Sequence, residues 1–385
     1  MTGIPSIPFG RPWITNSERE AVQKVLEGHI LTHGAKCKEF ENAFAQFIGR
    51  NTFCFAVSSC MSALHLAYFQ MGIGPGDEVI VPAQTHTATV HAVELVGATP
   101  IFVDCDLQTG NMNCERIEAA ITTSTKAIGL VHFLGIPCDM DQILHIADQH
   151  QLKVIEDCAL AVGARYKGKH VGLFGDAGCF SFYPVKHITT GEGGMFVTRH
   201  ADIGEQISRL RAFGVDRSHD ERAVPGKYDV TVLGLNARMS EMQAAIGCQQ
   251  LGKIGQILEL RANNFNRLKA SLTDIKGISI LDADHPDKSS SHYCLSVILH
   301  GHLKNYRDKI VRGLNNIGVG TSIYYPHPVP RLTYYAKKYG FQQESCVNAS
   351  AISDHSIALP VAPHVTLSDV EYISGSLKKV IEKVT

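Results

Sequence analysis

The sequence predicts an α/β protein that has a large, mainly parallel sheet and a smaller C-terminal α+β domain. From about residue 50 to residue 200, short apolar runs rich in β-branched residues alternate with longer amphipathic stretches, as strands alternate with helices in such folds. After residue 200 the pattern changes to a long helical stretch, a short strand and a closing helix. We therefore expect a large domain over residues 1–250, which includes the N-terminal segment, and a small domain over residues 251–385.

Seven strand-like runs make up the expected sheet. They cover residues 53–57, 78–83, 99–104, 126–133, 152–158, 177–183 and 194–198. Helical stretches are expected at residues 61–72, 85–97, 114–121, 140–150, 236–272 and 367–384. Glycines at 247, 252 and 255 mark a bend in the fifth of these. Because ligands of such sheets bind beyond the carboxyl ends of the strands, the residues that follow the runs are the candidates for function.

Composition and charge exclude several classes of function for this 385-residue chain. Hydrophobic residues make up 44% and charged residues 19%, so a sizeable core is expected and disorder is not. The net charge is −1 without a basic or acidic block, which argues against a nucleic-acid partner. No apolar run approaches the roughly 18 residues of a membrane span, and the start MTGIPSIPFGRPW lacks the pattern of a signal peptide. We expect a cytoplasmic protein with no membrane partner.

Cysteine and histidine are frequent but form no ligand pattern. The eleven cysteines are scattered without a C-x-x-C pair, and many stand inside apolar runs, which is typical of reduced, buried thiols in a cytosolic protein. None of the nineteen histidines belongs to an H-E-x-x-H motif. The expectation is therefore that the protein has no metal site.

Lys186 stands where the strand-like run FSFYPVK meets the glycine-rich turn GEGG. Most lysines are solvated surface residues, but glycines after this one let the backbone fold closely around a ligand. A phosphate loop for ATP is excluded, because in that motif the lysine follows the glycines. A lysine that forms a Schiff base with the aldehyde of pyridoxal phosphate fits better.

Pyridoxal phosphate has three further needs, and strand ends supply candidates for each. Asp157, in VIEDC, can hold the ring nitrogen protonated. The turn SSCMSALHLA offers free N–H groups to the phosphate, and His86 can lie on the ring face. Taken singly, an aspartate after a strand is more often a helix cap, and a histidine there is more often a polar loop residue. Their shared position at the strand ends of one sheet makes the combination specific.

With these motifs, the sequence resembles the DegT/DnrJ/EryC1/StrS family of sugar aminotransferases, which have the type I pyridoxal-phosphate fold. The resemblance covers nearly the whole chain and runs in the family's order. It is carried by ILTHGAKCKEFE, GIGPGDEVIVPAQTHTAT, TKAIGLVHFLGIPCDMD, VIEDCALAVGARYKGK, GDAGCFSFYPVKHITTGEGGMFVT and GLNARMSEMQAAIG. The resemblance implies amino transfer from an amino acid, expected to be L-glutamate, to a nucleotide-linked keto sugar, most often a 4-keto-6-deoxy sugar.

The resemblance also implies roles for matching residues. Lys186 would carry the cofactor covalently and Asp157 would face its ring nitrogen. His86 would stack on the ring. The remaining cofactor contacts would come from Cys60, Met61, Ser181 and Asn236. Of these, Asn236 would reach the phosphate of the neighbouring subunit's cofactor, which implies a homodimer with shared active sites.

Residues that line the sugar pocket follow from the same resemblance. They are Thr32, His33, Tyr325 and His327. Glu192 lies close to Lys186 in the sequence, and two roles for it are open: it positions the amino donor, or it caps the glycine turn.

Three departures from the family pattern concern the cofactor's surroundings. Cys60 and Met61 replace a small residue and a Thr or Ser in the phosphate turn, so a hydroxyl contact is lost while backbone N–H groups remain. Leu160 replaces a common Gln or His, and His86 replaces a Phe, Tyr or Trp. Together they indicate a subfamily whose substrate the sequence does not name.

Three alternatives compete with amino transfer. Sugar 3-dehydratases of the same family have histidine at the Schiff-base position, whereas this chain has Lys186 there and His187 after it. A non-catalytic regulator with the same fold is possible in principle, but the retention of the cofactor residues argues against it. A cysteine desulfurase needs a mobile reactive cysteine, and Cys346 is the only loop-like candidate.

Overall fold

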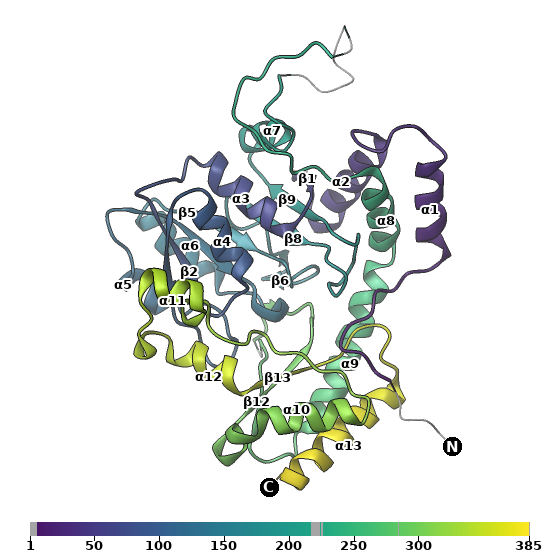
Figure 1. Cartoon of the computed structure of the whole chain (residues 1–385), viewed down its shortest axis with the longest axis vertical. Helices are drawn as coiled ribbons and strands as arrows, with labels where there is room; N and C mark the ends of the chain where they lie inside the picture. Colours follow the sequence, from purple (N-terminus) through teal and green to yellow (C-terminus); the bar gives the residue numbers. More distant parts are fainter. Residues whose placement is uncertain (1–5, 217–223, 225, 284, 385) are drawn as a thin grey trace.

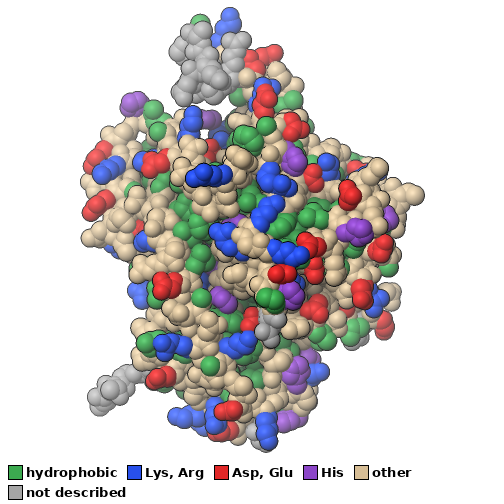
Figure 2. Space-filling model, turned by 180° about the vertical axis from the view of Figure 1, so that it is seen from behind, with side chains coloured by type: hydrophobic (Ala, Val, Ile, Leu, Met, Phe, Trp, Pro, Cys, Tyr) green, Lys and Arg blue, Asp and Glu red, His purple; other side chains and the backbone are tan. Residues whose placement is uncertain are grey.

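The computed structural model of the chain describes residues 6–216, 224, 226–283 and 285–384. Residues 1–5 and residue 385 lie outside the described residues. Residues 1–5 belong to the expected large domain and to the start of the chain that lacks the pattern of a signal peptide. None of the described helices has the length and apolar character needed to span a membrane. On the face seen in Figure 2, acidic and basic side chains are interspersed.

The largest sheet of the described residues has seven strands in the order β1-β9-β8-β5-β4-β2-β3. Their bounds are β1 (Phe53–Val57), β2 (Glu78–Pro82), β3 (Thr99–Val103), β4 (Thr125–Val131), β5 (Lys153–Asp157), β8 (Ala177–Ser181) and β9 (Gly194–Thr198). All pairings are parallel except the two made by β9, which runs antiparallel to both β1 and β8. The predicted α/β fold with a mainly parallel sheet is confirmed.

Helices cover this sheet and separate its parallel strands. They are α3 (Cys60–Gln70), α4 (Thr87–Leu95), α5 (Cys114–Ala119), α6 (Met140–Gln149) and α7 (Ala201–Leu210), with α1 (Asn16–Leu26) and α2 (Ala35–Ile48) preceding them. The sheet is buried on both faces: every residue of β8 and β9 is buried, as expected for parallel sheets covered by helices. Parallel strands place their carboxyl ends along one edge, where the residues that follow them gather.

The C-terminal part has its own small sheet, in the order β10-β12-β13. Its strands are β10 (Ile278–Ile280), β12 (Leu295–Leu299) and β13 (Ser356–Leu359), with α9 (Ile254–Leu272), α10 (Arg307–Asn316) and α13 (Leu367–Val384) packed around a common core. These elements occupy the lower part of Figure 1. Ile7, near the start of the chain, joins the same core.

Smaller elements connect the two parts. A third sheet pairs β11 (Lys288–Ser289) with β6 (Arg165–Tyr166), which in turn pairs with β7 (Lys169–His170). Helices α11 (Thr333–Tyr339) and α12 (Val347–His355) follow α10. We propose a domain boundary near residue 250, between α8 (Glu241–Gly252) and α9.

The long helix expected over residues 236–272 is in fact two helices, α8 and α9, that meet at Lys253. Residues 236–240 are not helical, because α8 begins at a capping box in which Ser240 and Gln243 exchange side-chain to backbone contacts. Before this cap, the Ala237 carbonyl accepts a hydrogen bond from the Ser58 N–H at 2.9 Å. The bend falls directly after Gly252, one of the three glycines that marked it.

Candidate active site

A cavity of about 450 Å³ opens at the carboxyl edge of the large sheet. It lies beyond the ends of β2, β4, β5 and β8 and is closed on one side by the N-terminus of α3. Eight of the candidate residues line it: Cys60, Met61, His86, Asp157, Ser181, Lys186, Glu192 and Tyr325. Residues up to 265 positions apart in the sequence thus meet in one place, and the order of the strands explains why.

Asp157 ends β5 and is a buried carboxylate, with only 4% of its surface exposed. The Thr89 hydroxyl donates a hydrogen bond to its Oδ2 at 2.8 Å, and the Ala159 N–H donates to its Oδ1 at 3.0 Å. The Cys60 thiol lies 3.8 Å from Oδ1. Among the described residues, no lysine, arginine or histidine forms an ion pair with it. A buried anion without a bonded cation is costly, and a protonated ring nitrogen would supply the missing charge.

Lys186 follows β8 and points into the same cavity. Its Nζ lies 5.3 Å from the centre of the Tyr293 ring, and no described residue is hydrogen-bonded to it. Burial lowers the pKa of Lys186, although the nearby charge of Asp157 opposes the shift. A lysine with a lowered pKa is more often neutral, which is the form that attacks an aldehyde.

The N-terminus of α3 is a candidate anion-binding turn. Ser59 caps the helix by accepting a hydrogen bond from the Ser62 N–H at 3.0 Å, which leaves the N–H groups of Cys60 and Met61 in the first turn for a ligand. Ser181, at the end of β8, lines the cavity with them.

The glycine-rich turn after Lys186 has a steric explanation. A Cβ atom on Gly194 would lie 2.5 Å from the carbonyl carbon of Ser59 and 2.6 Å from the nitrogen of Cys60. Gly191 has φ +82°, a left-handed conformation that favours glycine. The glycines therefore let β9 and the turn before it pack directly against the candidate anion-binding turn.

His86 and Tyr325 form an aromatic pair at the cavity. Their ring centres are 5.5 Å apart at an interplanar angle of 62°. The Ala88 N–H donates to Nδ1 of His86 at 3.1 Å, so the side chain caps α4 and carries its proton on Nε2 when neutral. Desolvation and the charge of Lys186 lower the pKa of His86. The ring is thus held in place and remains uncharged near neutral pH.

Glu192 and Leu160 also line the cavity. The backbone carbonyl of Glu192 accepts hydrogen bonds from the Thr190 hydroxyl and, at 2.8 Å, from the Gln243 amide. Its carboxylate makes no hydrogen bond with the described residues and is exposed. The turn is therefore fixed by the backbone of Glu192, and its side chain remains available to a ligand.

Four of the expected site residues do not line this cavity: Thr32, His33, Asn236 and His327. All four are exposed. Asn236 does not cap α8, because Ser240 does. His327 instead accepts a hydrogen bond from Arg331 Nε at 3.2 Å, and Arg331 pairs with Asp354.

Several residues of the site were not expected from the sequence. Thr85 donates to Thr89 at 2.7 Å, because the single hydroxyl proton of Thr89 is used on Asp157. The Tyr324 hydroxyl lies 2.6 Å from that of Tyr293. Thr85 and Thr89 lie on either side of His86 in the segment QTHTAT, so the strand-end argument could have included them. Tyr293 comes from the C-terminal part and carries no local signal.

The described residues contain one cluster with the donor types of a metal site: His132, Glu156 and Cys158, all buried. The atoms are already used, however. Nε2 of His132 lies 3.0 Å from Glu156, and Nδ1 accepts the Cys138 N–H at 3.1 Å. A histidine with both ring nitrogens bonded has no lone pair left for a metal ion, so these residues do not fit one.

Comparisons with known proteins agree with the geometry. The sequence pattern of the DegT/DnrJ/EryC1/StrS aminotransferase family matches residues 12–378. The GDP-perosamine synthase of Caulobacter vibrioides is 35% identical over 99% of this chain and 100% of that protein. The spore coat polysaccharide biosynthesis protein SpsC of Bacillus subtilis is 33% identical over 98% of this chain and 97% of its own length.

Solved structures lead to the same family and to its cofactor. The Streptococcus pneumoniae protein Spr1654 in its PLP form has a TM-score of 0.92 and 30% identity, over 99% of this chain and 100% of that one. The same protein was also solved in a PMP form. Together with the buried carboxylate and the cavity lysine, these findings confirm the expected fold and cofactor. The chain belongs to the DegT/DnrJ/EryC1/StrS aminotransferase family and is a pyridoxal-phosphate-dependent sugar aminotransferase.

Proposed function

We propose that the protein transfers the amino group of L-glutamate to the keto carbon of a nucleotide-linked 4-keto-6-deoxy sugar, in the biosynthesis of a surface polysaccharide or glycoconjugate. The observation that carries the proposal is the cavity in which Lys186 and Asp157 stand together. The choice of a nucleotide sugar is supported by the relatives named GDP-perosamine synthase, and a polysaccharide pathway by the name of SpsC. A GDP-linked acceptor is therefore the first to test.

The roles follow from the positions of the side chains. Bound pyridoxal phosphate supplies an electron sink for the carbon that loses or gains a proton. Asp157 holds the proton on the ring nitrogen, and the Cys60 and Met61 N–H groups with Ser181 bind the phosphate. The Lys186 amine would hold the cofactor covalently, and its free form would move a proton at the reacting carbon. Overall, the amino acid becomes a keto acid and the keto sugar becomes an amino sugar.

Contacts in the structure also bear on the rival functions. A dehydratase would use a histidine in place of Lys186, but His187 is buried and its Nε2 lies 2.9 Å from the Ser291 carbonyl rather than in the cavity. A desulfurase would need a mobile cysteine, whereas Cys346 is 1% exposed and does not line the cavity. Both observations favour amino transfer.

A panel of GDP-, UDP- and dTDP-linked keto sugars, each incubated with glutamate and the cofactor-loaded protein, tests this function. We expect mass spectrometry to find an amino group in place of the keto oxygen for one nucleotide series. Omission of glutamate provides the control. If no keto sugar is aminated but one is dehydrated, the lyase alternative replaces the proposal.

We also propose that the protein is a homodimer whose active sites are shared. Between α7 and α8, the described residues 211–216 and 226–235 lie at the top of Figure 1. They expose large apolar side chains, namely Phe213, Tyr228, Val230, Val232 and Leu233. Exposed apolar surface of this kind is typical of an interaction site, and a second copy of the chain is its proposed occupant. Asn236 lies in the same part of the chain, before α8, and is itself exposed.

A complementation experiment tests whether Asn236 acts across the interface. We expect mixed dimers of Asn236→Ala and Lys186→Ala chains to recover up to about half of wild-type turnover, because both lesions then fall in one site and the other is whole. Co-expression of differently tagged chains and tandem purification isolates the mixed dimer for the assay.

Homodimers of each variant, isolated in the same way, are the controls. If Asn236 acts within its own chain, each mixed dimer has two damaged sites and no recovery is seen. A mixed dimer with only about half the activity of the Asn236→Ala homodimer would therefore contradict a shared site.

A further inference from the structure

Glu156 is a fully buried acid that the roles described above do not use. It lies next to Asp157 on β5, and its carboxylate accepts hydrogen bonds from three backbone N–H groups of one loop. These donors are Gly172 at 2.6 Å, Phe174 at 2.7 Å and Gly175 at 2.7 Å. Burial alone would raise the pKa of Glu156, but the hydrogen bonds from His132 and this loop lower it below the usual value. Glu156 is therefore an anion fixed from several directions.

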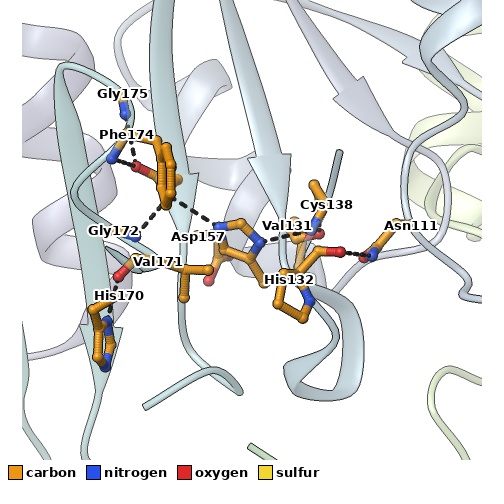
Figure 3. Close-up of polar contacts among 12 residues, drawn as sticks. Asn111, Val131, His132, Cys138, Asp157, His170, Val171, Gly172, Phe174 and Gly175 are labelled. Atoms are coloured by element: carbon orange, nitrogen blue, oxygen red, sulfur yellow. Dashed lines mark hydrogen bonds and ion pairs between the residues drawn. The ribbon is translucent and has the colours of Figure 1, made fainter. Parts of the chain in front are cut away.

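His132 is the fourth partner of Glu156, and its own contacts define its proton. The Cys138 N–H donates to Nδ1 at 3.1 Å, so Nδ1 is an acceptor, and the proton on Nε2 points to Glu156 at 3.0 Å. Figure 3 shows the ring between Cys138 on one side and the loop that contains Gly172 on the other. The imidazole thus connects the segment after β4 with Glu156 of β5, and Glu156 in turn holds the loop before β8.

This network is joined directly to the residue that faces the ring nitrogen. The backbone N–H of His132 donates to the carbonyl of Asp157 at 3.1 Å, and Glu156, the preceding residue of the same strand, is held by its own four hydrogen bonds. Successive side chains of a strand point to opposite faces, so Glu156 is held on one face while Asp157 reaches the cavity from the other. The same histidine thereby fixes two adjacent residues of β5. Its imidazole holds the Glu156 side chain, and its backbone N–H holds the Asp157 carbonyl.

We propose that Glu156 and His132 are a positioning pair that fixes the end of β5 and, with it, the direction in which Asp157 points. The proposal rests on the proposed contact of Asp157 with the ring nitrogen. A carboxylate that supports a cofactor must be held by its surroundings to within a fraction of an ångström. At metal sites, removal of an outer partner typically changes metal affinity by about 10- to 100-fold, and we expect an effect of similar size on cofactor affinity here.

Two buried histidines of the same region allow a matched test. In His132→Asn the shorter side chain can still accept the Cys138 N–H but no longer reaches Glu156, and in His132→Gln a donor is restored at the position of Nε2. The control is His170→Asn. His170 is equally buried, and its Nε2 accepts the Gly163 N–H at 2.9 Å while its Nδ1 lies 2.5 Å from the Val171 carbonyl; it makes no hydrogen bond to Glu156.

Two quantities are measured: the midpoint of thermal unfolding of the apoprotein, and the dissociation constant of pyridoxal phosphate by absorbance titration. We expect the two Asn variants to lose similar stability. Only His132→Asn should bind the cofactor about 10-fold more weakly, and His132→Gln should recover most of that loss. Equal cofactor affinity in His132→Asn and His170→Asn would overturn the proposal, because the network would then be structural only.

The reference variant Asp157→Asn separates this proposal from the function on which it rests. If cofactor affinity and the pH dependence of cofactor absorbance are unchanged in Asp157→Asn, the role of Asp157 itself is wrong. If Asp157→Asn changes both but His132→Asn changes neither, only the positioning pair is wrong. Should His132→Asn not fold, histidine ¹⁵N spectra of the wild-type protein decide: the His132 Nε2–H signal should shift when the cofactor binds, whereas an unshifted signal would contradict the proposal.

Discussion

Replacing Lys186 with alanine is expected to lower the rate of amino transfer by at least about 10²- to 10⁴-fold, the usual contribution of a general base. Loss of the covalent attachment adds to this effect. The fold should persist, because Nζ makes no hydrogen bond with the described residues and the Lys186 backbone N–H still bonds to the Tyr183 carbonyl. Stopped-flow measurement of each half-reaction, with circular dichroism as a check on folding, gives the comparison.

Lys186→Arg is the matched control, because arginine keeps a positive charge but does not lose its proton in proteins. We expect it to be nearly as inactive as Lys186→Ala, which would show that a neutral amine and not a charge is needed. Borohydride treatment of the wild-type holoenzyme should fix the cofactor on the peptide that contains Lys186. Near-normal turnover of Lys186→Ala, or a label on another lysine, would contradict the assignment.

The strands of the large sheet were predictable because burial leaves a clear trace in the sequence. The run over residues 194–198 begins with glycine and has an apolar centre, and β9 has those bounds. The antiparallel direction of β9 could not be predicted, because a strand buried on both faces has the same composition whichever way it runs. The same limit applies to the order of the strands.

The long helix after residue 236 was mispredicted although a local signal was present. In NARMSEMQ, Ser240 is followed three residues later by Gln243, the pattern of a capping box. This cap begins α8 and leaves Asn236 outside the helix. The residues before Ser240 have a composition that favours a helix, but the capping box is the more specific signal and determines where the helix begins.

Strand-end reasoning identified the residues that a single element presents to the cavity, such as Asp157 and Lys186. It missed residues whose role depends on tertiary packing. Tyr293 contacts Lys186 from more than one hundred residues away, and the four donors to Glu156 come from two separate loops. Nothing in the neighbouring sequence distinguishes such residues from ordinary core residues.

Replacing Asp157 with asparagine is the second large effect we expect, a fall in turnover of about 10²- to 10³-fold, as for other preorganised electrostatic groups. The ring nitrogen would lose its anionic partner, and the cofactor would withdraw electrons less strongly. The asparagine amide also disturbs the hydrogen bonds of this site. Both oxygens of the Asp157 carboxylate accept hydrogen bonds, one from the Thr89 hydroxyl and one from the Ala159 N–H. The NH₂ group of asparagine cannot accept a hydrogen bond, so it would face a donor in either position. The cofactor should still bind through its phosphate contacts.

Thr89→Val is the matched control for this change, because it removes the hydroxyl that donates to Asp157 while it keeps the shape of the side chain. The carboxylate retains its charge and its bond to Ala159, so we expect a smaller loss, of about 10-fold or the worth of one hydrogen bond to a charged group. Turnover is measured at saturating amino donor, after absorbance has shown that each variant is loaded with cofactor. An Asp157→Asn variant as active as the wild type would mean that another residue faces the ring nitrogen. A Thr89→Val variant more damaged than Asp157→Asn would contradict the assignment, because a hydroxyl that acts only by supporting the carboxylate cannot matter more than the charge of that carboxylate.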